Sequence, residues 1–319
     1  MLRTTVCLAA AVVSLVSALT GPVLAQEYPD RPIRVLVGYA AGGSVDINIR
    51  TIAPFLEKIL KVPVIVDNRP GAGGAVAWTN VAKAKADGYT LGSVNYPAIA
   101  GIVATGGLPF DPLEQFAFLG NIIYEPNVIA VAKNSPYKSL AEMIKYLKEN
   151  PSGISYGSSG IASLDGLIAL AVGSSAGVKF RSVNFEGDSA ALVAVLGGHV
   201  DAMGMAVSIA APLIQSDEIR AIGVGGSKRV SQLPDVPTFA EQGYPLAVNA
   251  SSRGFIVQAG TDPVIIAKLR DAIKTAAADP EYIAMATKMS QAVGYIPPDT
   301  VRADIQTQID FVRTVIPPK

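Results

Sequence analysis

The sequence has few of the side chains on which catalytic and metal sites usually depend. The 319 residues include one cysteine, one histidine and one tryptophan. The cysteine is Cys7, so the chain beyond residue 25 has neither a thiol nor a disulfide. His199 stands in a Gly-Gly-His-Val-Asp sequence that we interpret as a turn from a helix into a strand. These shortages argue against a nucleophile activated by histidine and against a metal site, because both usually draw on histidine or cysteine.

An excess of charge of either sign is also lacking. The chain has 26 basic and 26 acidic residues, and loss of the first 25 residues would remove only Arg3. Such a balance gives no electrostatic field to attract nucleic acid or an anionic membrane surface. No stretch after residue 25 is apolar enough to span a bilayer. Residues 26–319 are long enough for two domains.

The first 25 residues have the pattern of a secretory signal peptide. Arg3 precedes an apolar stretch over 6–24, and Val23-Leu24-Ala25 fits a small-x-small cleavage site. The alternative, a retained membrane anchor, is disfavoured because the stretch is marginal in length for a span. We therefore expect cleavage after Ala25 and export to a bacterial periplasm.

Short apolar stretches alternate with helical patterns almost to the C-terminus. Strands are predicted at 33–37, 62–66, 90–94, 116–122, 128–132, 153–156, 179–183, 202–205, 220–224, 254–257 and 293–296. Helices are predicted at 45–60, 74–86, 139–149, 163–175, 188–196, 208–215, 264–278 and 299–314. This alternation is typical of an α/β fold with mixed, mainly parallel sheets.

Two of the predicted strands suggest crossings between lobes. The segments 127–133 and 253–257 each lie between long α/β stretches, where a chain could pass from one lobe to another. This predicts a first lobe of residues 26–126 and 258–319 and a second lobe of residues 127–257, joined by a hinge.

The most informative stretch is residues 33–46, Ile-Arg-Val-Leu-Val-Gly-Tyr-Ala-Ala-Gly-Gly-Ser-Val-Asp. A buried strand runs into two glycines, then Ser44 as the expected N-cap, then a helix. Backbone N–H groups and the helix dipole meet there, which suits an anion. Asp46, in the first turn, is expected to fix the loop by accepting hydrogen bonds from its N–H groups rather than to act as a general base.

Three other strand-to-helix junctions, 68–74, 156–163 and 185–189, share this glycine- and serine-rich character. If they faced one another across a cleft, their N–H groups and hydroxyls would suit a carboxylate. The alternative for each is a tight turn before a capped helix. Gly71-Ala72-Gly73-Gly74 fails the dinucleotide pattern because Val76 occupies its last glycine position. Ser135-Pro136-Tyr137-Lys138 lacks the companion motifs of a serine enzyme.

Several motifs in order resemble one family, the periplasmic receptors of tripartite tricarboxylate transporters (TctC-like, or Bug-type). The resemblance spans nearly all of residues 26–319. Its motifs are Tyr-Pro-Asp-Arg-Pro-Ile at 28–33, Ala-Gly-Gly-Ser-Val-Asp at 41–46 with Arg50, Asn-Arg-Pro-Gly-Ala-Gly-Gly at 68–74, Ala-Asp-Gly-Tyr-Thr-Leu at 86–91, Leu-Pro-Phe-Asp-Pro at 108–112, Leu-Gly-Gly-His-Val-Asp at 196–201, Ser-Lys-Arg at 227–229 and Leu-Pro-Asp-Val-Pro-Thr at 233–238.

This resemblance implies a type II periplasmic-binding-protein fold. It implies a monomer that closes two lobes on a small carboxylate, with no cofactor or metal, and delivers the ligand to permease subunits in the membrane. By position, the first-lobe ligand contacts would be Tyr39, Ala41, Gly43, Ser44, Asp46, Asn95 and Tyr96. The second-lobe contacts would be Ser158, Ser159, Ile161, Ala162, Ser163, Glu186, Asp188 and Val207.

The chain departs from the family pattern at positions that bear on the ligand. Glu186 stands where many relatives have lysine, which disfavours a highly charged anion such as citrate and would suit a ligand with a donor group. The alternative is that Glu186 faces solvent. Arg253 replaces a tryptophan and could bind a second carboxylate or pair with an acid in the hinge. Ile161 and Ala162 make their wall of the cleft more apolar.

Two other functions stay open at this point. The chain could present its ligand to a membrane sensor rather than a permease, or it could be an exported enzyme of the α/β-hydrolase kind. The few candidate catalytic residues disfavour the enzyme.

Overall fold

The computed structural model describes residues 28–104, 106–158, 160–161, 163–185, 188–289 and 291–316. The predicted signal peptide therefore lies outside the described residues, as do three predicted ligand contacts, Ser159, Ala162 and Glu186. Within the described chain, no helix combines the length and the apolar character needed to cross a membrane.

The elements alternate along the chain much as the sequence predicts. The strands are β1 (Ile33–Val37), β2 (Val64–Asn68), β3 (Thr90–Tyr96), β4 (Phe116–Ala132), β5 (Ser155–Ser158), β6 (Arg181–Asn184), β7 (Ala202–Ala206), β8 (Ile219–Val224), β9 (Ala250–Gln258) and β10 (Val293–Ile296). The helices are α2 (Ser44–Leu60), the short 3₁₀ turn η2 (Ala72–Gly74), α3 (Ala75–Ala82), α4 (Ala98–Ala104), α5 (Pro112–Gln115), α6 (Leu140–Glu149), α7 (Leu164–Ala176), α8 (Asp188–Leu196), α9 (Val207–Gln215), α10 (Pro263–Ala277), α11 (Pro280–Lys288) and α12 (Pro298–Val315).

These strands form one mixed sheet in the order β2-β1-β3-β9-β4-β7-β5-β6, with β8 and β10 also paired with β4. The outer pairs, such as β1 with β2 and β5 with β6, are parallel. The central pairs, including β3 with β9 and β4 with β9, are antiparallel. The sheet is thus mixed, as predicted, but it is not mainly parallel, because every pairing of β4 and the pairing of β3 with β9 are antiparallel.

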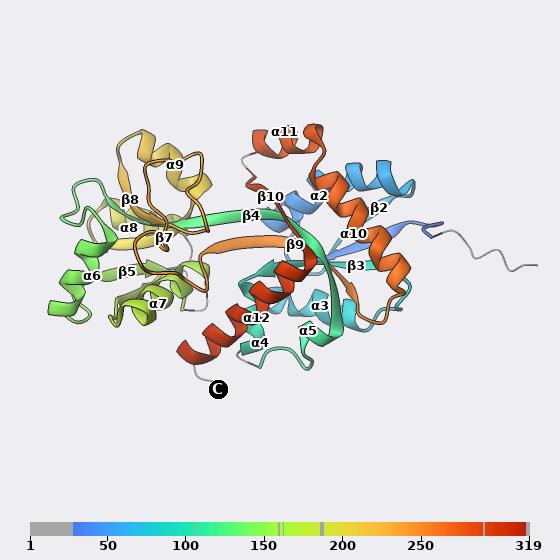
Figure 1. Ribbon diagram of the computed structural model, residues 1–319, viewed down its shortest axis with the longest axis horizontal. Coiled ribbons are helices and arrows are strands. Elements are labelled where there is room, and N and C mark those ends of the chain that lie inside the picture. Colours follow the sequence, from blue (N-terminus) through green and yellow to red (C-terminus); the bar gives the residue numbers. More distant parts are fainter. Residues whose placement is uncertain are drawn as a thin grey trace, which may run out of the picture.

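The long strand β4 runs from one half of the molecule into the other, with β9 beside it (Figure 1). The sequence predicts two strands at 116–122 and 128–132, but β4 runs without a break for 17 residues. Up to Pro126 it pairs with β9, and from Asn127 it pairs with β7 and β8. Buried apolar side chains continue through most of β4, because α10 and α12 pack on it in one half and α8 and α9 in the other.

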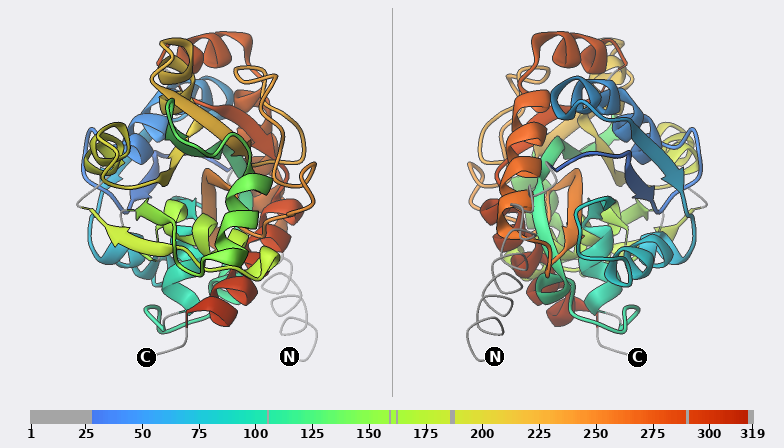
Figure 2. Two further views of the ribbon diagram at one scale, coloured as in Figure 1. Left: turned by 90° about the vertical axis from the view of Figure 1, so that its left-hand side faces the viewer. Right: turned by 90° about the vertical axis from the view of Figure 1, so that its right-hand side faces the viewer.

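Three helices were not predicted, and two of them have readable start signals. Asp111 caps α5 and Asp279 caps α11, and each is followed by proline at the first helical position. The third, α4, is short, and α12 packs against it. The end views of Figure 2 place α11 and α12 on opposite sides of the molecule.

Candidate functional site

The loop between β1 and α2 is held by a buried carboxylate. The prediction that Ser44 is the N-cap is wrong: α2 begins at Ser44, and Gly43 caps it without a side-chain hydrogen bond. Asp46, which is 1% exposed, supplies the missing acceptor from within the first turn. Its Oδ2 accepts from the Gly42 N–H at 2.8 Å, so Asp46 fixes the loop as the sequence predicts.

Two further side chains complete the contacts of Asp46. Asn68 donates to its Oδ1 at 2.9 Å, and the Arg50 Nε donates to both carboxylate oxygens at 2.9 and 3.0 Å. Burial alone would raise the pKa of Asp46, but the hydrogen bonds from Arg50, Gly42 and Asn68 outweigh it and lower the pKa. The carboxylate is therefore ionised at neutral pH and ties the first loop to the end of β2.

A pocket of about 260 Å³ opens next to this loop and takes residues from both halves of the molecule. We call it the Tyr39 pocket. Its lining residues are Tyr39, Gly73, Asn95, Pro97, Ala98, Ser163, Leu164 and Ser251. None of these is charged, so the polar groups available to a ligand are hydroxyls, one amide and the backbone.

The polar side chains of the Tyr39 pocket are linked to one another. The Tyr39 hydroxyl donates to the Gly73 carbonyl at 3.0 Å, and Asn95 Nδ2 lies 3.5 Å from the same hydroxyl. Ser251 Oγ lies 3.5 Å from Asn95 Oδ1. Burial raises the pKa of Tyr39. The hydrogen bond from Asn95 and the charge of Arg253 lower it by less, so the net shift is upward and the hydroxyl keeps its proton.

The second half contributes the start of α7. Ser163 is the N-cap of α7: its Oγ accepts from the Gly166 N–H at 3.2 Å and donates to the Gly160 carbonyl at 2.5 Å. This cap places Ser163 and the first turn of α7 at the pocket. Helix N-termini have unpaired backbone N–H groups and partial positive charge, which favour an anion there.

Two glycines let the loops around the Tyr39 pocket approach closely. A Cβ built on Gly38 would lie 2.6 Å from the Gly74 Cα, closer than real contacts allow. Gly74 itself has φ +111°, a conformation that side-chain-bearing residues rarely adopt. The glycines of these two loops thus bring the end of β1 against the start of α3.

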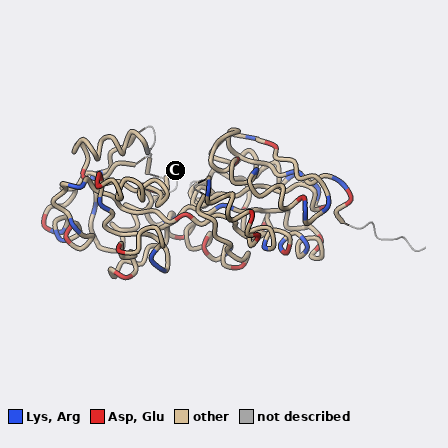
Figure 3. Tube along the Cα trace, turned by 90° about the horizontal axis from the view of Figure 1, so that it is seen from above, with Lys and Arg blue, Asp and Glu red and all other residues tan. Residues whose placement is uncertain are grey.

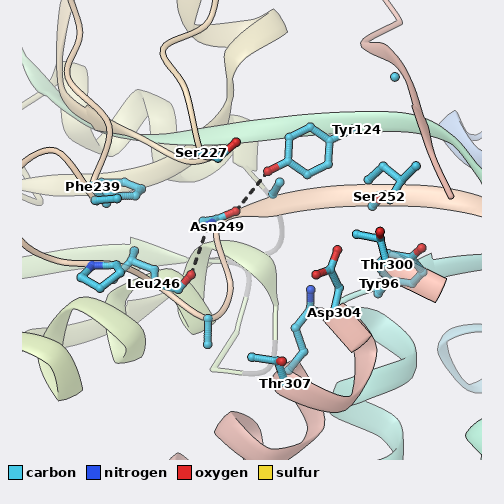
Figure 4. Close-up of a pocket in the computed structure, with 18 of the residues that line it drawn as sticks. Tyr96, Tyr124, Ser227, Phe239, Leu246, Asn249, Ser252, Thr300, Asp304 and Thr307 are labelled. Carbon is cyan, nitrogen blue, oxygen red and sulfur yellow. Dashed lines mark hydrogen bonds between the residues drawn. The ribbon is translucent and has the colours of Figure 1, made fainter. Parts of the chain in front are cut away.

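Neighbouring residues of the same strands face a different pocket. Because side chains alternate along a strand, Asn95 and Ser251 face the Tyr39 pocket, whereas Tyr96 and Ser252 point to the opposite face of the sheet. A pocket of about 650 Å³ lies on that face, between α12 and the segment 226–250 (Figure 4). We call it the Asp304 pocket, after the acid on α12 that lines it.

Arg253 lies in the crossing region, on the same side of β9 as Ser251. Its Nη1 donates to Asn48 Oδ1 of α2 at 2.9 Å and lies 3.9 Å from Glu125 Oε2. Glu125 in turn accepts from the Ser208 hydroxyl of α9. Of the two roles that the sequence allowed for Arg253, the structure shows the pairing with an acid, and this polar chain links α2 to α9 across the middle of the sheet.

The predicted site residues are only partly brought together. Tyr39, Asn95 and Ser163 line the Tyr39 pocket, and the loop holding Ala41, Gly43, Ser44 and Asp46 adjoins it without lining it. Tyr96 lines the Asp304 pocket, Ile161 lines an apolar pocket at α7, and Val207 lines a pocket beside α9. Ser158 is buried at the end of β5, and Asp188 begins α8.

Ser251 was not predicted to belong to this site. It stands two residues before Arg253 in the returning strand, and only the pairing of β9 with β3 brings it beside Asn95. Because Ser251 and Arg253 are two residues apart in a strand, the sequence could have placed both side chains on one face.

Charge and metal-binding groups are dispersed. Lysine, arginine, aspartate and glutamate are scattered over both halves (Figure 3). Within the described ranges, no three histidine, cysteine or acidic side chains lie close enough to hold a metal ion.

Comparison with known proteins identifies the family. Residues 48–316 match the family described as tripartite tricarboxylate transporter family receptor, TctC. A UPF0065 protein of Cupriavidus necator is 37% identical over 277 residues, which is 86% of this chain and 84% of that protein. Protein BugT of Bordetella pertussis is 32% identical over 262 residues, 82% of this chain and 80% of its own. The chain belongs to the TctC family of solute-binding receptors, which are periplasmic.

Solved structures of the family have the same fold. A TctC solute-binding protein from Polaromonas, solved with no ligand, has a TM-score of 0.84 at 27% identity, covering 91% of this chain and 99% of its own. MatC from Rhodopseudomonas palustris with bound malate has a TM-score of 0.68 at 27% identity, and the match covers 90% of this chain and 99% of MatC. Another R. palustris protein, solved with adipate, has a TM-score of 0.68 at 26% identity, and the match covers 91% of this chain and 98% of that protein.

Proposed function

We propose that this chain is a non-catalytic receptor that binds a small dicarboxylate in the Tyr39 pocket and closes its two halves around it. The observation that carries the proposal is the make-up of that pocket: hydroxyls, an amide and a helix start, contributed by both halves. Such groups bind a carboxylate through hydrogen bonds without a positively charged side chain. Malate and adipate in two family structures support a dicarboxylate.

The lobes of this receptor would be residues 26–126 with 258–319, and residues 127–257. The change of partner along β4, from β9 at Pro126 to β7 at Asn127, supports this division. The two crossing strands would then be the hinge.

In this proposal the structure corresponds to the open receptor, and comparison with solved structures supports that assignment. Its TM-score is 0.84 against the family member solved with no ligand and 0.68 against each of the two solved with a dicarboxylate. A rotation of one half against the other lowers a TM-score even when each half is unchanged.

Calorimetry on residues 26–319 tests the proposal with malate, adipate and citrate as ligands. We expect one dicarboxylate bound per chain and recovered chemically unchanged, and weaker binding of the triply charged citrate. Asn95→Leu should abolish binding, whereas Asn150→Leu, at an exposed asparagine after α6, should leave it intact. Failure of all three acids to bind, or their conversion, would contradict the receptor.

Mass spectrometry of the exported protein tests cleavage after Ala25, which predicts Gln26 at the N-terminus. Co-purification from membranes then separates the two possible partners. Recovery of a large and a small permease subunit supports transport, and recovery of a sensor kinase instead would assign ligand presentation.

A further inference from the structure

The Asp304 pocket is large enough for a second ligand and lies apart from the Tyr39 pocket. Its volume of about 650 Å³ is within the range of small-molecule sites. Residues of α12 and β10 form one side, and the segment from Gly226 to Ala250 forms the other. The three central strands separate it from the Tyr39 pocket, as the alternation of Asn95 and Tyr96 shows.

The pocket contains one carboxylate and no counter-charge. Figure 4 shows Asp304 pointing from α12 into the space below Tyr124. Among the described residues, Asp304 has neither a hydrogen-bond donor nor an ion-pair partner, and the lining includes no lysine, arginine or histidine. Burial raises the pKa of Asp304, the mark of a carboxylate drawn out of water without compensation.

Two other acceptors in the same lining are unpaired or weakly paired. Gln308, one turn further along α12, is 7% exposed, and its Oε1 has no partner among the described residues. Asn249 Oδ1 lies 3.5 Å from the Tyr124 hydroxyl, a weak contact that leaves acceptor capacity. One carboxylate and two carboxamide oxygens thus line a pocket that has no lysine, arginine or histidine among its described lining residues.

The walls of the pocket are aromatic. Tyr96, Tyr124 and Phe239 line it with their rings (Figure 4). Aromatic rings attract organic cations through their electron-rich faces and also bury the apolar body of such a ligand. A bare metal ion would use neither property, and the described residues provide Asp304 alone as a charged metal ligand in this lining.

We propose that the Asp304 pocket binds a small organic ammonium compound. The ammonium group pairs with Asp304 and donates to the acceptor oxygens of Gln308 and Asn249. The organic body packs against Tyr96, Tyr124 and Phe239. This site is independent of the carboxylate site, since it uses none of the residues of the Tyr39 pocket.

Calorimetry on residues 26–319 with benzylammonium and benzyl alcohol tests the charge requirement directly. The two probes share the ring and differ in the cationic group. We expect benzylammonium to bind one per chain and benzyl alcohol to bind at least about tenfold more weakly, as for loss of one charged hydrogen bond. Equal binding of the two probes, or no saturable binding of benzylammonium, would overturn the proposal.

Variants locate the site. Asp304→Asn should weaken benzylammonium binding at least about tenfold. Asp310→Asn, which removes an exposed acid from the same helix, should leave it unchanged. Asn95→Leu, which alters the Tyr39 pocket, should also leave it unchanged. If Asp304→Asn retains full affinity, or Asn95→Leu loses it, the amine binds elsewhere and the assignment fails.

Discussion

The Tyr39 pocket and the Asp304 pocket lie on opposite faces of the same strands. The polar side chains at the first are hydrogen-bonded to one another, whereas the carboxylate in the second is hydrogen-bonded to no described residue. Around the Tyr39 pocket, the side chains of Tyr39, Asn95 and Ser251 are linked to one another, and Asp46 beneath the adjoining loop has three donors. In the Asp304 pocket, the single acid has no partner among the described residues.

The two pockets show two ways in which a protein can favour a ligand: by ordering the binding side chains beforehand, or by leaving a buried charge without a partner. Side chains that already hold one another in place lose little freedom when a ligand binds, which favours selectivity for one geometry. A carboxylate kept without a partner instead lowers stability until a cation arrives. The following substitutions test this contrast, from the largest expected effect to the smallest.

Arg253→Gln should have the largest effect, because it leaves Glu125 nearly buried without a positive charge. Side-chain exposures of 13% for Arg253 and 12% for Glu125 place the pair largely out of water. We expect a loss of about 3 kcal/mol in the free energy of unfolding, measured in urea. Adding Glu125→Gln should restore part of it. Arg229→Gln, in an exposed pair with Glu241, serves as the control and should cost under about 1 kcal/mol.

Asp46→Asn should cost about 2 kcal/mol at neutral pH, since the loop loses a charged acceptor. The pKa of Asp46 is lowered from 3.8 on folding, so its stabilisation is present above about pH 4. This stabilisation is lost as the pH falls through the pKa that Asp46 has in the folded protein, which is below 3.8. Urea unfolding at a series of pH values should therefore show the two proteins converging in acid, and a constant gap would contradict this origin.

Ser163→Ala should cost about 1 kcal/mol, the usual value of an N-cap. Ser139 caps α6 in the same way, far from both pockets, so Ser139→Ala is a matched control. The two variants should lose similar stability in thermal unfolding, but only Ser163→Ala should weaken dicarboxylate binding. Equal affinities in calorimetry would remove Ser163 from the ligand site.

Asp304→Asn should have the smallest effect and the opposite sign. The pKa of Asp304 is raised on folding, so its charge destabilises the fold above that value and the penalty is relieved as the pH falls toward 3.8. Tyr96 and Tyr124, the titratable side chains facing it, stay neutral because burial raises the pKa of both. We expect Asp304→Asn to raise the melting temperature slightly at pH 7 and to leave it unchanged at pH 3. A lower melting temperature at pH 7 would contradict this, because it would mean that the Asp304 carboxylate makes a favourable contact.

Much of the fold could be predicted from the sequence because its signals are local. The limits of β1 and β10 and the function of Asp46 followed from apolar runs and a first-turn acid. The short helix α4 was missed because its seven residues carry no strong start signal. The single strand β4 was missed because Pro126 resembles a strand break, whereas in the structure Pro126 stays in register opposite Ala250 of β9.

The site was harder to predict because it depends on contacts between distant segments. Tyr39, Asn95 and Ser163 were predicted as ligand contacts and share a pocket, but Ser251 joins them only through the insertion of β9 between β3 and β4. Asn95 and Tyr96 were predicted together, yet alternation sends them to opposite faces. Family motifs name positions along the chain, and the pleat of the sheet decides which pocket each position serves.

The alternation of pockets along β3 and β9 has a consequence for the evolution of the protein. Single-nucleotide changes in adjacent codons, such as those of Asn95 and Tyr96 or of Ser251 and Ser252, alter one pocket and leave the other intact. A saturation-mutagenesis map read along these codons should therefore show phenotypes with a period of two. The specificities of the two faces can drift separately by substitution, whereas a frame-preserving insertion of one codon would exchange them.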